Sequence, residues 1–118
     1  MRKTHHANMV GHLAKSPSQI HQEMTPSSAG LIHMVMGISG ETGELLDAVK
    51  KHVIYQKALD YDNLIEELGD IEFYLEGFRQ LLDITREETL TANIAKLGKR
   101  YPGFEYTNQA AQIRADKA

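Results

Sequence analysis

The chain has 118 residues, a formal net charge of −3 and no cysteine. This length fits one domain, which can bury about 60–70% of its unfolded surface. The mild charge argues against a broad nucleic-acid-binding surface, and the lack of cysteine excludes disulfides and cysteine-ligated zinc. The longest apolar run, at 31–36, is far too short to span a bilayer, and the N-terminus lacks the apolar region of a signal peptide. We expect a soluble, cytoplasmic protein that binds neither membranes nor nucleic acid.

Two helices are predicted to begin at a capping residue followed by proline. At positions 16–17, Ser-Pro supplies an N-cap and a first helical residue, and Gln19 completes a capping box. Thr-Pro at 25–26 repeats the signal and opens a long helix that we expect to reach about Ile54. At ~100° per residue its apolar side chains form one arc, with Glu41 and Glu44 beside it. The arc comprises Leu31, Met34, Val35, Ile38, Leu45, Leu46, Val49 and Val53.

A third helix is predicted from about Tyr61 to Leu82, bordered on its apolar face by Glu67 and Asp70. That face comprises Leu64, Leu68, Ile71, Leu75, Phe78 and Leu82. Ile65 and Phe73 lie off this stripe, which indicates a second buried surface such as a subunit contact.

A fourth helix, at about 86–99, follows a capping box formed by Thr85 and Glu88 and ends before Pro102-Gly103. From Thr107 the chain is polar and alanine-rich, so we expect a core at about 17–104 and a loosely held tail at 105–118. No alternating strand pattern persists. The sequence predicts a single all-α domain, a helical bundle.

Two acidic pairs with equal spacing are the most informative feature of the chain. Glu41 and Glu44 lie three residues apart in the second helix, as do Glu67 and Asp70 in the third. Residues at this spacing share a helix face, so packing the two helices side by side brings four carboxylates together. Without a cation they would repel one another and some would take up protons. Mg²⁺ or Mn²⁺ prefers such oxygen ligands, so the pattern predicts a metal-dependent catalyst. One acidic pair alone is more often an ordinary solvated helix face.

Asn93, Lys96 and Arg100 share one face of the fourth helix. An amide, an ammonium and a forked guanidinium together suit phosphate groups. Alternatively, the two cations simply favour the negative end of the helix dipole. Opposite a carboxylate-bound cation, the three residues would suit a polyphosphate substrate.

Three ordered motifs resemble the MazG-type nucleoside triphosphate pyrophosphohydrolases, members of the all-α NTP pyrophosphatase superfamily. The motifs are GETGELLDA at 40–48, EELGD at 66–70 and NIAKLGKRYP at 93–102. The family signature is E-x-x-E followed, after a spacer, by E-x-x-D, and the spacer here is 45–66. Many MazG proteins carry a double Glu before the first pair, whereas Gly40 stands at that place here.

The resemblance implies hydrolysis of a (d)NTP between the α- and β-phosphates, giving (d)NMP and pyrophosphate for nucleotide-pool control. It implies that the four acids bind Mg²⁺, with Mn²⁺ as a substitute, or that one of them, Glu41 by its position, instead orients or deprotonates the attacking water. Further residues are expected to contact the substrate. Those expected at the phosphates are Lys51, Asn93, Lys96 and Arg100, and those expected at the base or sugar are His33, Gly37 and Tyr74.

The helices have more apolar surface than one chain of this length can cover, which favours a homodimer or a dimer of dimers. Two alternatives stay open: a dUTPase-like or dCTPase-like relative specific for a pyrimidine, and a non-catalytic helical dimer with a cation site. The preferred base and sugar are not predicted.

Overall fold

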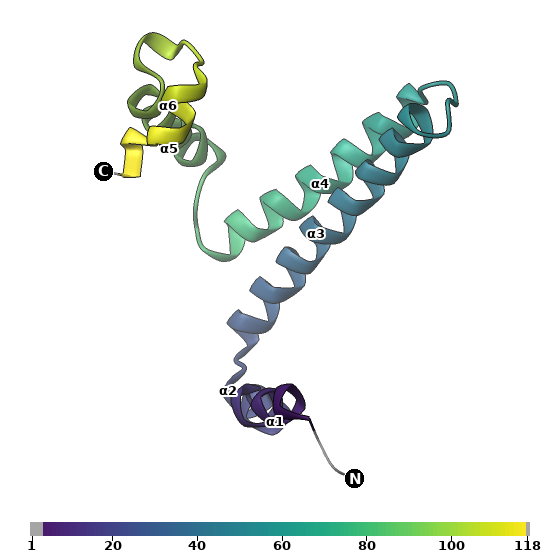
Figure 1. Cartoon of the computed structure of the whole chain (residues 1–118), viewed down its shortest axis with the longest axis vertical. Helices are drawn as coiled ribbons and strands as arrows, with labels where there is room; N and C mark the ends of the chain where they lie inside the picture. The colour runs from purple at the N-terminus through teal and green to yellow at the C-terminus, as the bar shows by residue number, and fades with distance from the viewer. Residues whose placement is uncertain (1–3, 118) are drawn as a thin grey trace.

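The structure is a computed structural model that describes residues 4–117. Over that range it is all-α and contains no strand, as the sequence predicts (Figure 1). Its elements are α1 (His5–Leu13), α2 (Pro17–Glu23), α3 (Pro26–Val53), α4 (Tyr61–Leu81), α5 (Arg86–Arg100), η1 (Pro102–Phe104), α6 (Asn108–Ile113) and η2 (Ala115–Lys117). None of the helices within this range is long and apolar enough to cross a membrane.

The predicted caps set the starts of α3 and α5. The Thr25 hydroxyl accepts a hydrogen bond from the Ser28 backbone N–H, and the Ser28 hydroxyl accepts one from the Thr25 N–H. Thr85 and Glu88 form the same reciprocal pair at α5. These bonds satisfy N–H groups that have no partner inside the helix, so they fix where each helix begins.

The predicted capping box at α2 is wrong in one half. Ser16 accepts from the Gln19 N–H, but the Gln19 side chain donates to Glu23 Oε1 at 3.1 Å. In a capping box the Gln19 side chain would accept from the Ser16 N–H, whereas here its amide donates to a charged carboxylate one turn ahead. Helix α1 was not predicted, although Thr4 caps it by accepting from the Ala7 N–H at 3.1 Å.

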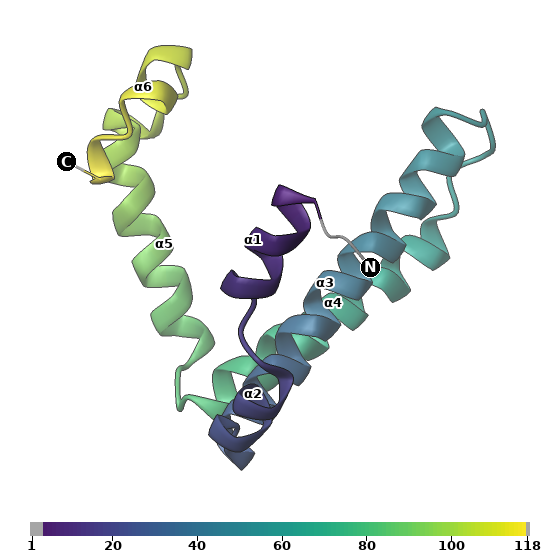
Figure 2. The same cartoon turned by 60° about the horizontal axis from the view of Figure 1, so that its bottom comes forward.

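Helices α3 and α4 form the long antiparallel hairpin on which the rest of the chain is arranged (Figures 1 and 2). Its seam is the set of half-buried side chains that recur every three or four residues on each helix. The apolar members are Leu31, Met34, Ile38, Leu45 and Ala48 on α3, with Leu64, Ile71, Leu75 and Phe78 on α4. Glu41 and Glu67 are also half-buried and continue this register. The expectation that the acids only border the apolar stripe is therefore wrong for these two.

Close approach of the helices depends on Gly37, because a Cβ at this position would lie 2.3 Å from the ring of Tyr74. Real Cβ atoms essentially never come that near, so any side chain here would displace the tyrosine. By contrast, a Cβ on Gly40 would meet nothing within 4 Å.

Gly37→Ala is expected to lower the free energy of unfolding by about 1–3 kcal/mol, the usual cost of overpacking. Gly40→Ala is the matched control, and it should raise the same quantity by roughly 0.5–1 kcal/mol through helix propensity alone. Urea titration followed by far-ultraviolet circular dichroism measures both variants. If both variants are stabilised equally, the two helices pack less closely at Tyr74 than the structure shows.

After α4 the chain turns away from the hairpin, and α5 extends as a separate arm (Figures 1 and 2). η1 contacts α5, and so do α6 and η2, which belong to the segment at 105–118 for which we expect loose attachment. Thr107 caps α6 by accepting from the Ala110 N–H at 2.9 Å, and Asp116 pairs with Arg100 on α5.

The single chain has no enclosed core, because none of the described residues is buried as a whole. The radius of gyration is 20.3 Å, whereas about 13.5 Å is usual for a compact domain of this length. The hairpin and the arm therefore leave long apolar faces uncovered.

Candidate metal centre

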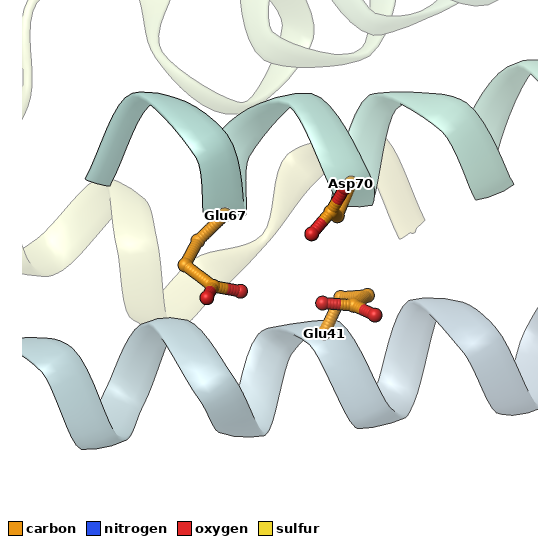
Figure 3. A group of neighbouring side chains, drawn as sticks. All are labelled: Glu41, Glu67 and Asp70. Carbon is orange, nitrogen blue, oxygen red and sulfur yellow. The ribbon is translucent and has the colours of Figure 1, made fainter. Parts of the chain in front are cut away.

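Three carboxylates meet across the α3–α4 seam. Glu41 comes from α3, and Glu67 and Asp70 come from α4, with one oxygen of each within 4.8 Å of the others. Figure 3 shows the three side chains pointing into the space between the two helices. The i, i+3 spacing places Glu67 and Asp70 on one side of α4, and the antiparallel register brings Glu41 opposite them.

Among the three carboxylates, Glu67 has the least favourable electrostatic surroundings. Its Oε2 atom is buried and has no hydrogen-bond partner. Loss of water around the carboxylate raises the pKa of Glu67 above its usual value of 4.5, and the charge of the neighbouring Glu41 raises it further. The charges of Asp70 and Glu44 act in the same direction. A buried carboxylate oxygen without a donor is costly, and a bound cation would remove that cost.

The donor set fits a hard divalent cation. All three groups offer oxygen, which Mg²⁺ and Mn²⁺ prefer over nitrogen and sulfur. Glu67, the residue with the unpartnered oxygen, belongs to this group, so the residues present suit the ion that the acidic pairs predict.

Glu44 does not join the other three. It is exposed on α3, one turn beyond Glu41, and its oxygens lie outside the 4.8 Å group. Its charge nevertheless acts on Glu67. The predicted four-acid set is thus present as three close carboxylates and a fourth nearby, and the metal-binding role of all four stays a prediction.

His33, Gly37 and Tyr74, the residues predicted for a base or sugar contact, do come together. The rings of His33 and Tyr74 meet edge to face, with their centroids 6.2 Å apart, and the Tyr74 ring lies against Gly37. Phe73 adds a second edge-to-face contact with Tyr74 at 5.1 Å. Tyr74 follows Asp70 by one helical turn, so this aromatic group adjoins the carboxylates along the seam.

The residues predicted to bind phosphate lie apart from the carboxylates within one chain. Asn93 and Lys96 are exposed on α5, the arm that diverges from the hairpin (Figure 2). Lys51 extends from α3 and pairs with Asp47 at 3.2 Å, one turn earlier.

Arg100 pairs with Asp116, a residue that the sequence does not single out. The Arg100 Nε donates to one carboxylate oxygen at 2.7 Å and Nη2 donates to the other at 3.1 Å. The two residues are sixteen apart in the chain. No local spacing rule links residues so far apart, and only the placement of η2 on α5 joins them.

A family model described as the MazG nucleotide pyrophosphohydrolase domain matches residues 30–104. The chain belongs to this family. The match confirms the resemblance drawn from the three motifs, and with it the all-α class. It spans the hairpin and α5 and stops short of α6. MazG enzymes are generally metal-dependent, which agrees with the carboxylate group on α3 and α4.

The MazG domain is also similar to a curated phage protein. Gene 37 protein of Mycobacterium phage L5 is 35% identical over an alignment of 80 residues, which covers 63% of this chain and 68% of the phage protein. No solved structure matches the chain significantly.

Proposed function

We propose that the protein is a Mg²⁺-dependent nucleoside triphosphate pyrophosphohydrolase that converts a (d)NTP to (d)NMP and pyrophosphate. The observation that carries the proposal is the group of three carboxylates, one of them with a buried, unpartnered oxygen, inside a MazG domain. An acidic helix face that only solubilises the protein would keep its carboxylates apart and hydrated, since like charges repel.

The carboxylates supply the metal site and the base. Mg²⁺, or Mn²⁺ in its place, would be held by Glu41, Glu67 and Asp70 with Glu44 nearby, and when bound it would neutralise phosphate oxygens and make water more acidic. Glu41, alone on α3 within the close group, would orient the attacking water and accept its proton. Water then adds across the bond between the α- and β-phosphates, and pyrophosphate leaves.

The aromatic group at His33, Gly37 and Tyr74 would hold the base or sugar. It adjoins the carboxylates along the seam, so a nucleotide with its phosphates at the metal extends naturally toward it. The flat rings offer stacking and edge contacts to a heterocycle. In this proposal the hairpin recognises the base, while all of the predicted phosphate-binding residues except Lys51 lie on α5.

The phosphate contacts would come from a second copy of the chain. Within one chain Asn93, Lys96 and Arg100 lie on an arm that turns away from the hairpin (Figure 1), and only Lys51 shares a helix with Glu41. A homodimer, or a dimer of dimers, in which the arm of one copy reaches the hairpin of the other would complete the site. The uncovered apolar faces of the chain favour such an assembly.

Incubation of the protein with each of the four common NTPs and four dNTPs, with and without Mg²⁺, tests the proposal. Chromatography of the products should show a nucleoside monophosphate and pyrophosphate, formed only with the metal. Release of a diphosphate and orthophosphate would contradict the proposed bond. A single pyrimidine substrate would indicate a dUTPase-like or dCTPase-like enzyme. If no nucleotide yields a product, the remaining interpretation is a non-catalytic helical dimer with a cation site.

A further inference from the structure

The guanidinium of Arg100 is already occupied in the structure. Its Nε and Nη2 groups donate to the two carboxylate oxygens of Asp116, at 2.7 and 3.1 Å. The pair is shielded from water, since the side chains of Arg100 and Asp116 are 17% and 3% exposed. The contact raises the pKa of Arg100 and lowers that of Asp116, so both groups stay charged.

A carboxylate in this fork has the geometry of a phosphate ligand. Arginine binds carboxylate and phosphate through the same two parallel N–H donors. Asp116 therefore occupies the position at which a phosphate group of a substrate would meet Arg100.

The surroundings of Asp116 are cationic. A pocket of about 230 Å³ beside the pair is lined by Lys96, Lys99, Lys117, Ala95 and Asp116. Asp116 is the single acid among three ammonium-bearing side chains in this lining, so removing its charge would leave a site that attracts anions. Lys96 is itself one of the residues predicted to bind phosphate.

The segment that carries Asp116 is short and contributes no large apolar side chain that is buried. Helix α6 has six residues and ends at Arg114, a non-glycine residue in the left-handed region with φ of 52°. Its largest apolar side chain, Ile113, is 64% exposed. The segment also lies beyond the residues that match the MazG domain, 30–104. Among the described residues, the Arg100–Asp116 pair is the one salt bridge that joins this segment to α5.

We propose that the C-terminal segment is autoinhibitory: Asp116 occupies the phosphate-binding fork of Arg100 and competes with the triphosphate of the substrate. The proposal rests on the proposed function, in which Arg100 binds phosphate. Substrate or a partner must displace Asp116 before Arg100 can act. Competition of this kind weakens apparent substrate affinity without changing the chemical step.

Asp116→Asn in the full chain tests the proposal. The neutral amide cannot hold both donors of the fork as a carboxylate does, so the KM for the (d)NTP is expected to fall by roughly 5- to 10-fold while kcat stays unchanged. The dissociation constant of inorganic tripolyphosphate, measured by titration calorimetry in EDTA, should fall by a similar factor. Gln112→Ala, an exposed change in the same segment, should alter neither quantity.

The double variant Arg100→Ala with Asp116→Asn tests whether Asp116 competes with phosphate for Arg100 or only attaches the C-terminal segment to α5. If Asp116 acts through Arg100, adding Asp116→Asn to Arg100→Ala has no further effect on tripolyphosphate binding. If the protein hydrolyses nucleotides and Asp116→Asn leaves the KM unchanged or raises it, the autoinhibition proposal is wrong. The proposed enzymatic function is then unaffected. Tighter tripolyphosphate binding by Asp116→Asn, in a protein that hydrolyses no nucleotide, supports the competition while the proposed function fails.

Discussion

Glu67→Gln is expected to lower kcat by at least about 100-fold and leave helicity unchanged. Mutating a residue that only hydrogen-bonds to a metal ligand typically lowers metal affinity or activity by about 10- to 100-fold. Loss of a ligand itself should therefore lower activity more. Glutamine keeps the length, the helix propensity and one oxygen of glutamate, but it loses the charge that would hold the cation. Steady-state kinetics with saturating Mg²⁺ and far-ultraviolet circular dichroism measure the two effects. Glu44→Gln, which removes the exposed fourth acid, should also stop turnover if all four carboxylates serve the metal.

Glu66→Gln is the matched control, because Glu66 is the adjacent residue on α4, exposed, and outside the group of three carboxylates. It makes the same chemical change one position away and should retain activity. Equal activity of Glu67→Gln and Glu66→Gln would remove the assignment of the metal centre.

The same pair of variants gives a pH signature in the absence of metal. The pKa of Glu67 is raised above its usual 4.5 in the folded chain, so the proton on this carboxyl favours the folded state. Its contribution to stability is fully present below pH 4.5 and is lost as the pH rises through the raised pKa. In EDTA, Tm should therefore decline with pH less steeply for Glu67→Gln than for wild type and Glu66→Gln. Added Mg²⁺ should restore Tm in wild type and in Glu66→Gln but not in Glu67→Gln.

The helix starts could be predicted because they depend on neighbouring residues. At Thr25 and Thr85 a hydroxyl reaches an N–H three residues on, and such bonds require nothing beyond one turn of chain. At Gln19 the prediction failed because the side chain had two partners within one turn and took Glu23. Helix α1 has the same kind of cap, at Thr4, which accepts from the Ala7 N–H, so the same local rule could have predicted its start.

The sequence predicts which residues form the candidate site, but it does not predict which of them are buried between the two helices. Spacing alone places Glu67 and Asp70 on one side of α4, and it pairs Glu41 with Glu44 in the same way. Which of them enters the seam depends on the rotation of each helix about its axis, which is set by side-chain packing along the whole hairpin. Glu41 and Glu67 consequently took seam positions, and Glu44 did not.

Contacts between distant segments were beyond the reach of sequence patterns. The Arg100–Asp116 pair joins residues sixteen apart through a segment whose composition suggested a loose tail. The path of α5 away from the hairpin is also set by the turn after α4, where Asp83 adopts a left-handed conformation with φ of 56°. Helix periodicity carries no information about such a turn.

Leu46→Asp is expected to dissociate the proposed homodimer and abolish activity. Leu46 is 69% exposed and belongs to an apolar stripe on α3 that faces away from α4. The stripe, spaced for helix packing, comprises Ile32, Met36, Leu46 and Val53. Gly43 lies within it, and a Cβ there would meet nothing in the same chain. A carboxylate placed in the middle of an apolar interface is unpaired and dehydrated, which strongly opposes association.

The accessible surface supports the size of this interface. The chain exposes 9831 Å², whereas a folded monomer of 13.3 kDa exposes about 6,500 Å². The difference is roughly 3,400 Å² per chain, whereas obligate interfaces bury about 1,000–2,500 Å² on each partner, so the excess is large enough for such an interface. On α4, Ile65 and Phe73 are 67% and 65% exposed, so the second buried surface predicted from their positions also needs a partner.

Light scattering coupled to gel filtration measures the outcome directly. Wild type should elute at two or four times 13.3 kDa, and Leu46→Asp should elute at the mass of one chain with reduced helicity, because that chain has no enclosed core of its own. Leu46→Met, which conserves volume and apolar character, is the matched control and should keep the assembly. A wild-type protein that stays monomeric and active would contradict the shared site, since α5 could not then reach the carboxylates from a second copy. An assembly that survives Leu46→Asp would instead place the subunit contact away from this stripe of α3.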